Sequence, residues 1–116
     1  MYRRAGGQQD YLIRMIQQAG EVLRRLRGRA AEGAPAVELI DTARSAQAAL
    51  FGERAEMLQR LDAASAVFLI GDDEAVRLWI ELLREEAAAH RAGGDAESAA
   101  RVEQRALLLE RALPTE

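Results

Sequence analysis

The sequence predicts an all-α protein, an antiparallel bundle of about five helices, and three observations support this fold class. Apolar residues recur at spacings of three and four along most of the chain, as on one face of a helix. No stretch alternates apolar and polar residues as a half-buried strand does. Short segments with Gly, Pro or Asp separate the periodic stretches, so consecutive helices are expected to pack antiparallel.

The first helix is expected to begin after Asp10, because Asp favours the N-cap position. Its apolar face consists of Leu12, Ile16, Ala19, Leu23 and Leu26. Three neighbouring residues widen this face: Tyr11, Met15 and Val22. Gly20 interrupts this helix, which costs about 1 kcal/mol relative to Ala and would be explained by a close helix crossing. Gly28 and Gly33 bracket its end. Residues 1–9 are expected to form a flexible tail.

Pro35 suits the first turn of a second helix, and Gly52 is a residue type that ends helices. The inward face of this helix is predicted to hold Ala36, Leu39, Ile40, Ala43, Leu50 and Phe51.

Two interpretations are open for residues 53–70. A single helix would bury one face, made of Leu58, Leu61, Ser65 and Phe68. Alternatively, Asp62 caps a short new helix over residues 63–70, because Asp favours caps over helix interiors. We favour a break near Leu61 and Asp62.

Gly71 ends that segment, and Asp72 is expected to cap a long helix that closes at Gly93 and Gly94. Its inward face is Val76, Trp79, Leu82, Leu83 and Ala87. Asp95 then caps a last helix with the inward residues Ala99, Val102, Ala106, Leu109 and Leu113, and Pro114 closes it. The residues predicted to form the core of the whole bundle are Leu12, Ile16, Leu23, Leu26, Leu39, Ile40, Phe68, Trp79, Leu83, Val102, Ala106 and Leu109.

The composition limits the classes of function. The 116 residues are the size of a single domain. The chain has no Cys, which excludes disulfides, thiol catalysis and Cys-ligated zinc. All 16 basic residues are Arg, which is typical of a GC-rich bacterial genome and excludes Lys chemistry. No signal-peptide or membrane-spanning apolar run occurs, so we expect a cytoplasmic protein without a membrane partner.

Residues that carry chemistry are few. His90 is the only His and lies four residues after Glu86. These two residues alone are too few to form a metal site. We interpret His90 as a helix-end His stabilised by the helix dipole. The acidic triplet at 72–74 fits an N-cap with first-turn acids. The three serines, Ser45, Ser65 and Ser98, lie in no nucleophile motif. We therefore expect no catalytic residue, no cofactor, no metal and no enzymatic activity.

Charge is unevenly distributed along the chain. Residues 1–31 hold seven Arg and two acids, a net charge of +5, whereas residues 32–116 carry −8. One interpretation is that the first helix packs against the acidic remainder. The other is a basic patch for an acidic partner or for nucleic acid, made of Arg3, Arg4, Arg24, Arg25, Arg27 and Arg29.

Two parts of the chain carry resemblances. The segment QDYLIRMIQQ at residues 9–18, with AVELID and ALFG in the second helix, resembles a family of small all-helical bacterial proteins known only as a domain of unknown function. The last forty residues are similar to a single tetratricopeptide-type hairpin, with Gly94, Ala99 and Ala106 at the small positions. His90 departs from the aromatic residue of that repeat. Both resemblances imply a helical fold and neither implies an active site.

These observations predict a single-domain, non-catalytic protein-interaction or scaffold module of unknown partner. The predicted interaction face lies on the first helix and comprises Tyr11, Ile13, Met15, Val22, Arg24 and Arg25. Because this apolar face is wider than one neighbour covers, one prediction is a homodimer through the first helix, and the alternative is a monomeric bundle with the first helix at its centre. The alternative function is a nucleic-acid-associated accessory protein that uses the N-terminal arginines.

Overall fold

The structure, a computed structural model, describes the backbone of residues 2–114 and the side chains of residues 10–114. Over this range the chain forms four long helices, two short helices and one 3₁₀ turn, without any strand. They are α1 (Tyr2–Ala31), α2 (Ala36–Phe51), η1 (Gly52–Arg54), α3 (Ala55–Arg60), α4 (Ala63–Ile70), α5 (Asp73–Ala92) and α6 (Ala96–Ala112). The predicted all-α fold class is confirmed. None of the described helices is long and apolar enough to cross a membrane.

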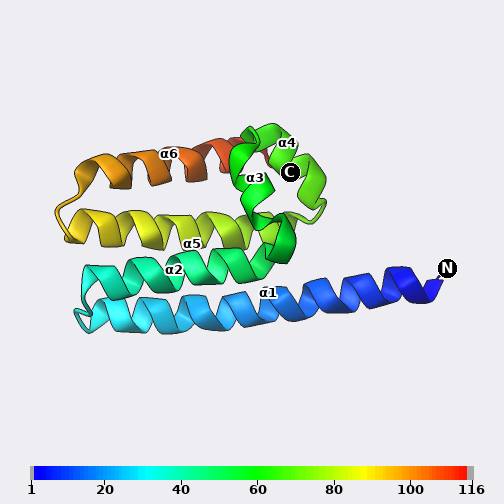
Figure 1. Cartoon of the computed structure of the whole chain (residues 1–116), viewed down its shortest axis with the longest axis horizontal. Coiled ribbons are helices and arrows are strands. Elements are labelled where there is room, and N and C mark those ends of the chain that lie inside the picture. The colour runs from blue at the N-terminus through cyan, green and yellow to red at the C-terminus, as the bar shows by residue number, and fades with distance from the viewer. Residues whose placement is uncertain (1, 115–116) are drawn as a thin grey trace.

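The long helices run in alternating directions, and α5 lies between α2 and α6 (Figure 1). Helix α1 packs along α2 and also contacts α5, while α6 contacts α5 and α4. The short helices α3 and α4 fold back after α2 and occupy one end of the bundle (Figure 1). Because α1 is the longest helix, its first turns extend beyond the others (Figure 1).

Three aspartates cap helices as predicted. The Asp62 carboxylate accepts a hydrogen bond from the Ser65 amide at 3.1 Å, at the start of α4. Asp72 caps α5 and Asp95 caps α6 in the same way, with bonds of 2.9 Å and 3.0 Å. The break favoured between α3 and α4 is therefore confirmed, since it follows from the cap at Asp62.

The boundary predicted at Asp10 is wrong. Helix α1 begins at Tyr2, so Asp10 lies within the helix and is not its N-cap. Residues 2–9 contain no Pro, and the helix that carries the apolar face continues back through them, although Gly6 and Gly7 are unfavourable in a helix interior. The backbone of residues 2–9, expected to be a flexible tail, is helical, and its flexibility stays a prediction.

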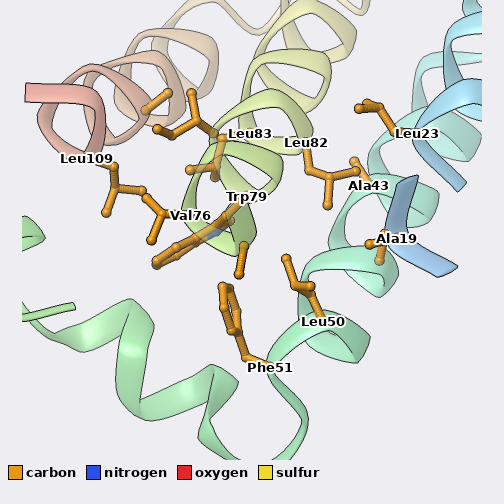
Figure 2. Close-up of a cluster of buried hydrophobic side chains, with 14 of the residues drawn as sticks. Ala19, Leu23, Ala43, Leu50, Phe51, Val76, Trp79, Leu82, Leu83 and Leu109 are labelled. Atoms are coloured by element: carbon orange, nitrogen blue, oxygen red, sulfur yellow. The ribbon is translucent and has the colours of Figure 1, made fainter. Parts of the chain in front are cut away.

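The core centres on Trp79 of α5, which is 1% exposed. Its ring meets the Phe51 ring edge-on, with 5.0 Å between centroids and an angle of 71°. Figure 2 shows Leu109 of α6 on one side of this pair and Leu50 of α2 on the other. The predicted core residues of the long helices are buried or, for Leu12, Ile40 and Val102, half-buried against the core.

Phe68 was predicted in the core, and this prediction is wrong, because its side chain is 83% exposed. Helix α4 starts at the Asp62 cap and packs on the bundle with Ala66 and Ile70 buried. Phe68 lies two residues from each, which is about 200° around a helix of 3.6 residues per turn. It therefore points away from the bundle.

The close helix crossing expected at Gly20 is also absent. A Cβ at Gly20 would meet no atom within 4 Å, so the position has space for a methyl group. Gly93, in contrast, is a close approach, because a Cβ there would lie 2.9 Å from the Cβ of Ala36.

We predict that Gly20→Ala raises the free energy of unfolding by about 0.5–1 kcal/mol, because Ala restricts the unfolded chain and suits a helix interior. Gly93→Ala is the matched control and should lower it by about 1–3 kcal/mol through the clash with Ala36. Urea unfolding followed by circular dichroism measures both. A destabilised Gly20→Ala variant would show that α1 packs closely at this position.

Candidate interaction surfaces

The predicted interaction face of α1 divides into two sides of the helix. At about 100° per residue, Tyr11, Met15, Val22 and Arg25 lie within about 80° of one another. Ile13 and Arg24 lie on the other side of the helix, across the buried face that holds Ile16 and Leu23. On that side, Arg24 lines a shallow groove between α1 and α5.

Exposure differs among the apolar members of this face. Tyr11 is 55% and Ile13 is 53% exposed, so both offer apolar area to a partner. Met15 and Val22 are half-buried against the core. The freely exposed apolar surface of α1 is therefore narrower than the sequence predicts.

Two of the N-terminal arginines are held in ion pairs. Arg27 donates to Glu81 and Glu85 of α5, which fits the interpretation that α1 packs against the acidic remainder. Arg29 donates two hydrogen bonds to Glu38 at 2.8 Å and 2.9 Å. These bonds hold the pKa of the Glu38 carboxyl below its usual value.

A second surface, the α4 surface, consists of Phe68 and Leu69. Leu69 is also exposed, so two large apolar neighbours face solvent on one short helix. The helix is fixed at both ends, because Asp62 caps its start and Gly71, with φ of 71°, closes it. Arg54 also donates to the Leu69 carbonyl at 3.3 Å. The α4 surface is thus an apolar surface on a well-anchored element.

A third surface is a shallow groove of about 630 Å³ between α2, α3, α5 and α6, which we name the cationic groove. Its floor on α5 is Trp79, Leu83 and Glu86. Helix α2 contributes Arg44 and Gln47, α3 contributes Gln59, and α6 contributes Arg101, Val102 and Arg105. Three arginines and a single acid therefore line this groove, in a chain whose net charge is −3.

The single acid of the cationic groove, Glu86, is 4% exposed and fully engaged. Arg44 Nε donates to Oε2 at 3.0 Å, and Gln47 Nε2 donates to Oε1 at 2.8 Å. Nε2 of His90 lies 3.2 Å from Oε2. The Trp79 indole N–H in turn donates to Oε1 of Gln47 at 3.3 Å. Among the described residues no buried side-chain nitrogen or oxygen lacks a partner, so this network is structurally complete.

Arg105 differs from the other arginines of the cationic groove. Its guanidinium lies over the Trp79 ring, 5.4 Å from the centroid, and donates to the Leu58 carbonyl at 2.9 Å. Within residues 10–114 no carboxylate lies within 4.0 Å of it. Burial lowers the pKa of Arg105, while the more distant charge of Asp62 raises it.

The sequence did not predict the α4 surface or the cationic groove. The α4 surface depends on which face of α4 packs on α5 and α6, and the groove depends on how α2 and α6 lie beside α5. His90 lies in the last turn of α5 as predicted, but it is buried against Glu86. In the part of the chain that the structure describes, no three His, Asp or Glu side chains converge as a metal site would require.

Comparisons with protein-family models, curated proteins and solved structures find no match for this chain. The resemblances to the uncharacterised helical family and to a tetratricopeptide-type hairpin therefore stay predictions.

We predict that Glu86→Ala lowers the free energy of unfolding by about 2–4 kcal/mol, because it leaves the buried Gln47 and His90 without their carboxylate partner. The neighbouring Glu85→Ala is the control, since it removes only a surface ion pair with Arg27 and should change stability by at most about 1 kcal/mol. Chemical denaturation of the two variants measures the difference. Equal effects would show that the network around Glu86 adds nothing to the packing of α2 on α5.

Proposed function

We propose that this protein is a non-catalytic protein-interaction or scaffold module of the bacterial cytoplasm. The observation that carries the proposal is the α4 surface, where Phe68 is 83% exposed on a helix anchored at both ends. A Phe side chain offers about 150–250 Å² of apolar area, and burial stabilises a complex by about 25 cal/mol per Å². A partner that covers Phe68 and Leu69 would gain several kcal/mol before the entropy of association is subtracted.

Aromatic residues on a pre-formed element make effective contact points in protein interfaces. They bury a large area and lose little conformational entropy when a partner binds. Helix α4 needs no rearrangement for Phe68 to be presented, because the Asp62 and Gly71 caps already fix the helix. Exposed neighbouring apolar side chains of this kind mark interaction sites more often than isolated ones do.

The alternative, a nucleic-acid-associated protein, has less support. Arg27 and Arg29 are occupied by Glu81, Glu85 and Glu38, so their charge is balanced within the fold. Arg24 and Arg25 are exposed and remain available to phosphates. Retention on DNA or RNA that falls steeply with salt would favour this alternative.

We predict that affinity capture from extracts of the source cells yields a protein partner with the wild type and loses it with Phe68→Ser. The substitution removes the apolar area of the α4 surface without touching the core. The measurement is quantitative mass spectrometry of proteins retained by each variant, with circular dichroism as the test of folding.

Val37→Ser is the matched control, because Val37 is 71% exposed at the start of α2, at the end of the bundle opposite α4 (Figure 1). It should retain the partner like the wild type. If Phe68→Ser retains every partner, the α4 surface is not where the protein binds.

Self-association through α1 is a separate prediction, supported by the exposure of Tyr11 and Ile13. In sedimentation equilibrium at micromolar concentration, we expect a dimer of the 12.8 kDa chain. Tyr11→Glu should shift it to monomer, because a charge would enter the interface, whereas Val37→Glu should not. A wild-type monomer near 12.8 kDa would exclude the dimer.

A further inference from the structure

We propose that the cationic groove binds an acidic, extended peptide segment of a partner protein, with Arg101 and Arg105 holding its carboxylates. This site is distinct from the α4 surface, and the proposal goes beyond the function inferred from Phe68. Its basis is a mismatch between the charges that line the groove and the acids available inside the protein to balance them.

The first step is the charge of the groove. Its only acid, Glu86, is buried and already bound by Arg44, Gln47 and His90. Among the described residues Glu86 makes no hydrogen bond or ion pair with the remaining two arginines, which both lie on α6.

Arg101 is the more accessible of these two arginines. Its side chain is 66% exposed, and its carboxylate contact, with Glu97 on the same helix, is 3.9 Å long. A helix-surface pair of this kind contributes about 0.3–0.5 kcal/mol and is readily exchanged for another anion. Arg101 Nη2 also donates to Ser98 Oγ at 2.9 Å, so the two polar contacts of Arg101 are exposed ones within its own helix, which an anionic ligand can replace.

Arg105 is the stronger indication of an anionic ligand. It is held in place by the Leu58 carbonyl and the Trp79 ring, yet neither contact is charged. A half-buried guanidinium loses hydration, and a hydrogen-bonded anion compensates this loss more strongly than a neutral carbonyl or a ring face does. A carboxylate matches the planar fork of guanidinium N–H donors in two parallel bonds. Because the side chain is already positioned, binding would order little more of it.

The dimensions and the lining favour a peptide. The groove measures about 630 Å³, which is far more than one carboxylate or phosphate fills. Val102 provides an apolar neighbour to the two arginines, and the exposed amide of Gln59 offers a donor and an acceptor for a peptide backbone.

Nucleic acid fits this groove less well. Single strands bind where bases stack on exposed aromatic rings beside basic residues. The only aromatic residue in the groove is Trp79, whose 1% exposure leaves no face for a base.

The test begins with selection of a random octapeptide library against the folded wild-type protein. We expect the selected peptides to be enriched in Asp and Glu. The consensus peptide is then labelled and its dissociation constant is measured by fluorescence anisotropy. Binding of the peptide should weaken as the salt concentration increases. Replacing the Asp and Glu residues of the peptide by Asn and Gln should abolish binding. Absence of acidic enrichment would overturn the proposal.

Variants locate the site. Arg101→Gln should weaken binding by about tenfold, through loss of one charge-assisted contact. Arg105→Lys keeps the charge but loses the two-pronged geometry, so a similar loss is expected while the fold is retained. Arg84→Gln is the matched control, because Arg84 is an α5 arginine outside the groove and pairs with Glu103 and Glu110. Equal weakening by Arg84→Gln would overturn the proposal.

Two further measurements separate this proposal from its competitors. Phe68→Ser should bind the peptide like the wild type, so failure of the α4 surface and failure of the groove are distinguishable. A labelled single-stranded octanucleotide should bind more weakly than the peptide. If it binds more tightly and Arg101→Gln removes that binding, the groove belongs to nucleic acid and the peptide proposal is wrong.

Discussion

The indole of Trp79 is the contact that connects the separate parts of this bundle. Its edge packs on Phe51 at the end of α2, its N–H is bound by Gln47, and Arg105 of α6 lies over its face. Trp79 is the only Trp of the chain and one of its few aromatic residues. Its ring contacts both α2 and α6 from α5, within a larger apolar core that also joins these helices.

Glu86 extends the same arrangement one and a half to two turns further along α5. A buried carboxylate is tolerated only where hydrogen bonds and positive charge replace its hydration. Gln47 serves both groups, since its oxygen accepts from Trp79 and its nitrogen donates to Glu86. This double role fixes the register of α2 on α5, because a shift by one residue would leave an indole N–H and a carboxylate without partners. The arginines that line the cationic groove are positioned by that register.

The parts of the fold that depend on local chemistry were predictable from the sequence, and the parts that depend on pairing between helices were not. Asp62, Asp72 and Asp95 cap helices because the cap is a local hydrogen bond. Asp10 has the same side chain, but the helix continues through it and through Gly6 and Gly7 before it. The cap at Asp62 gives the start of α4 but not the face that packs, and every residue of α4 except Ser65 is apolar, so the exposure of Phe68 had no signal in the sequence. The link from Trp79 through Gln47 to Glu86 was not, because residues 32 and 39 positions apart have no local signal for contact.

The break between α3 and α4 connects both proposed binding surfaces. It ends α3 at Leu61, whose N–H donates to the Leu58 carbonyl at 3.4 Å, and the same carbonyl accepts the hydrogen bond from Arg105. It also starts α4, which packs with Ala66 and Ile70 buried and Phe68 exposed. The break at Asp62 thus separates two helices, one whose end holds Arg105 in the cationic groove and one that presents Phe68 to solvent.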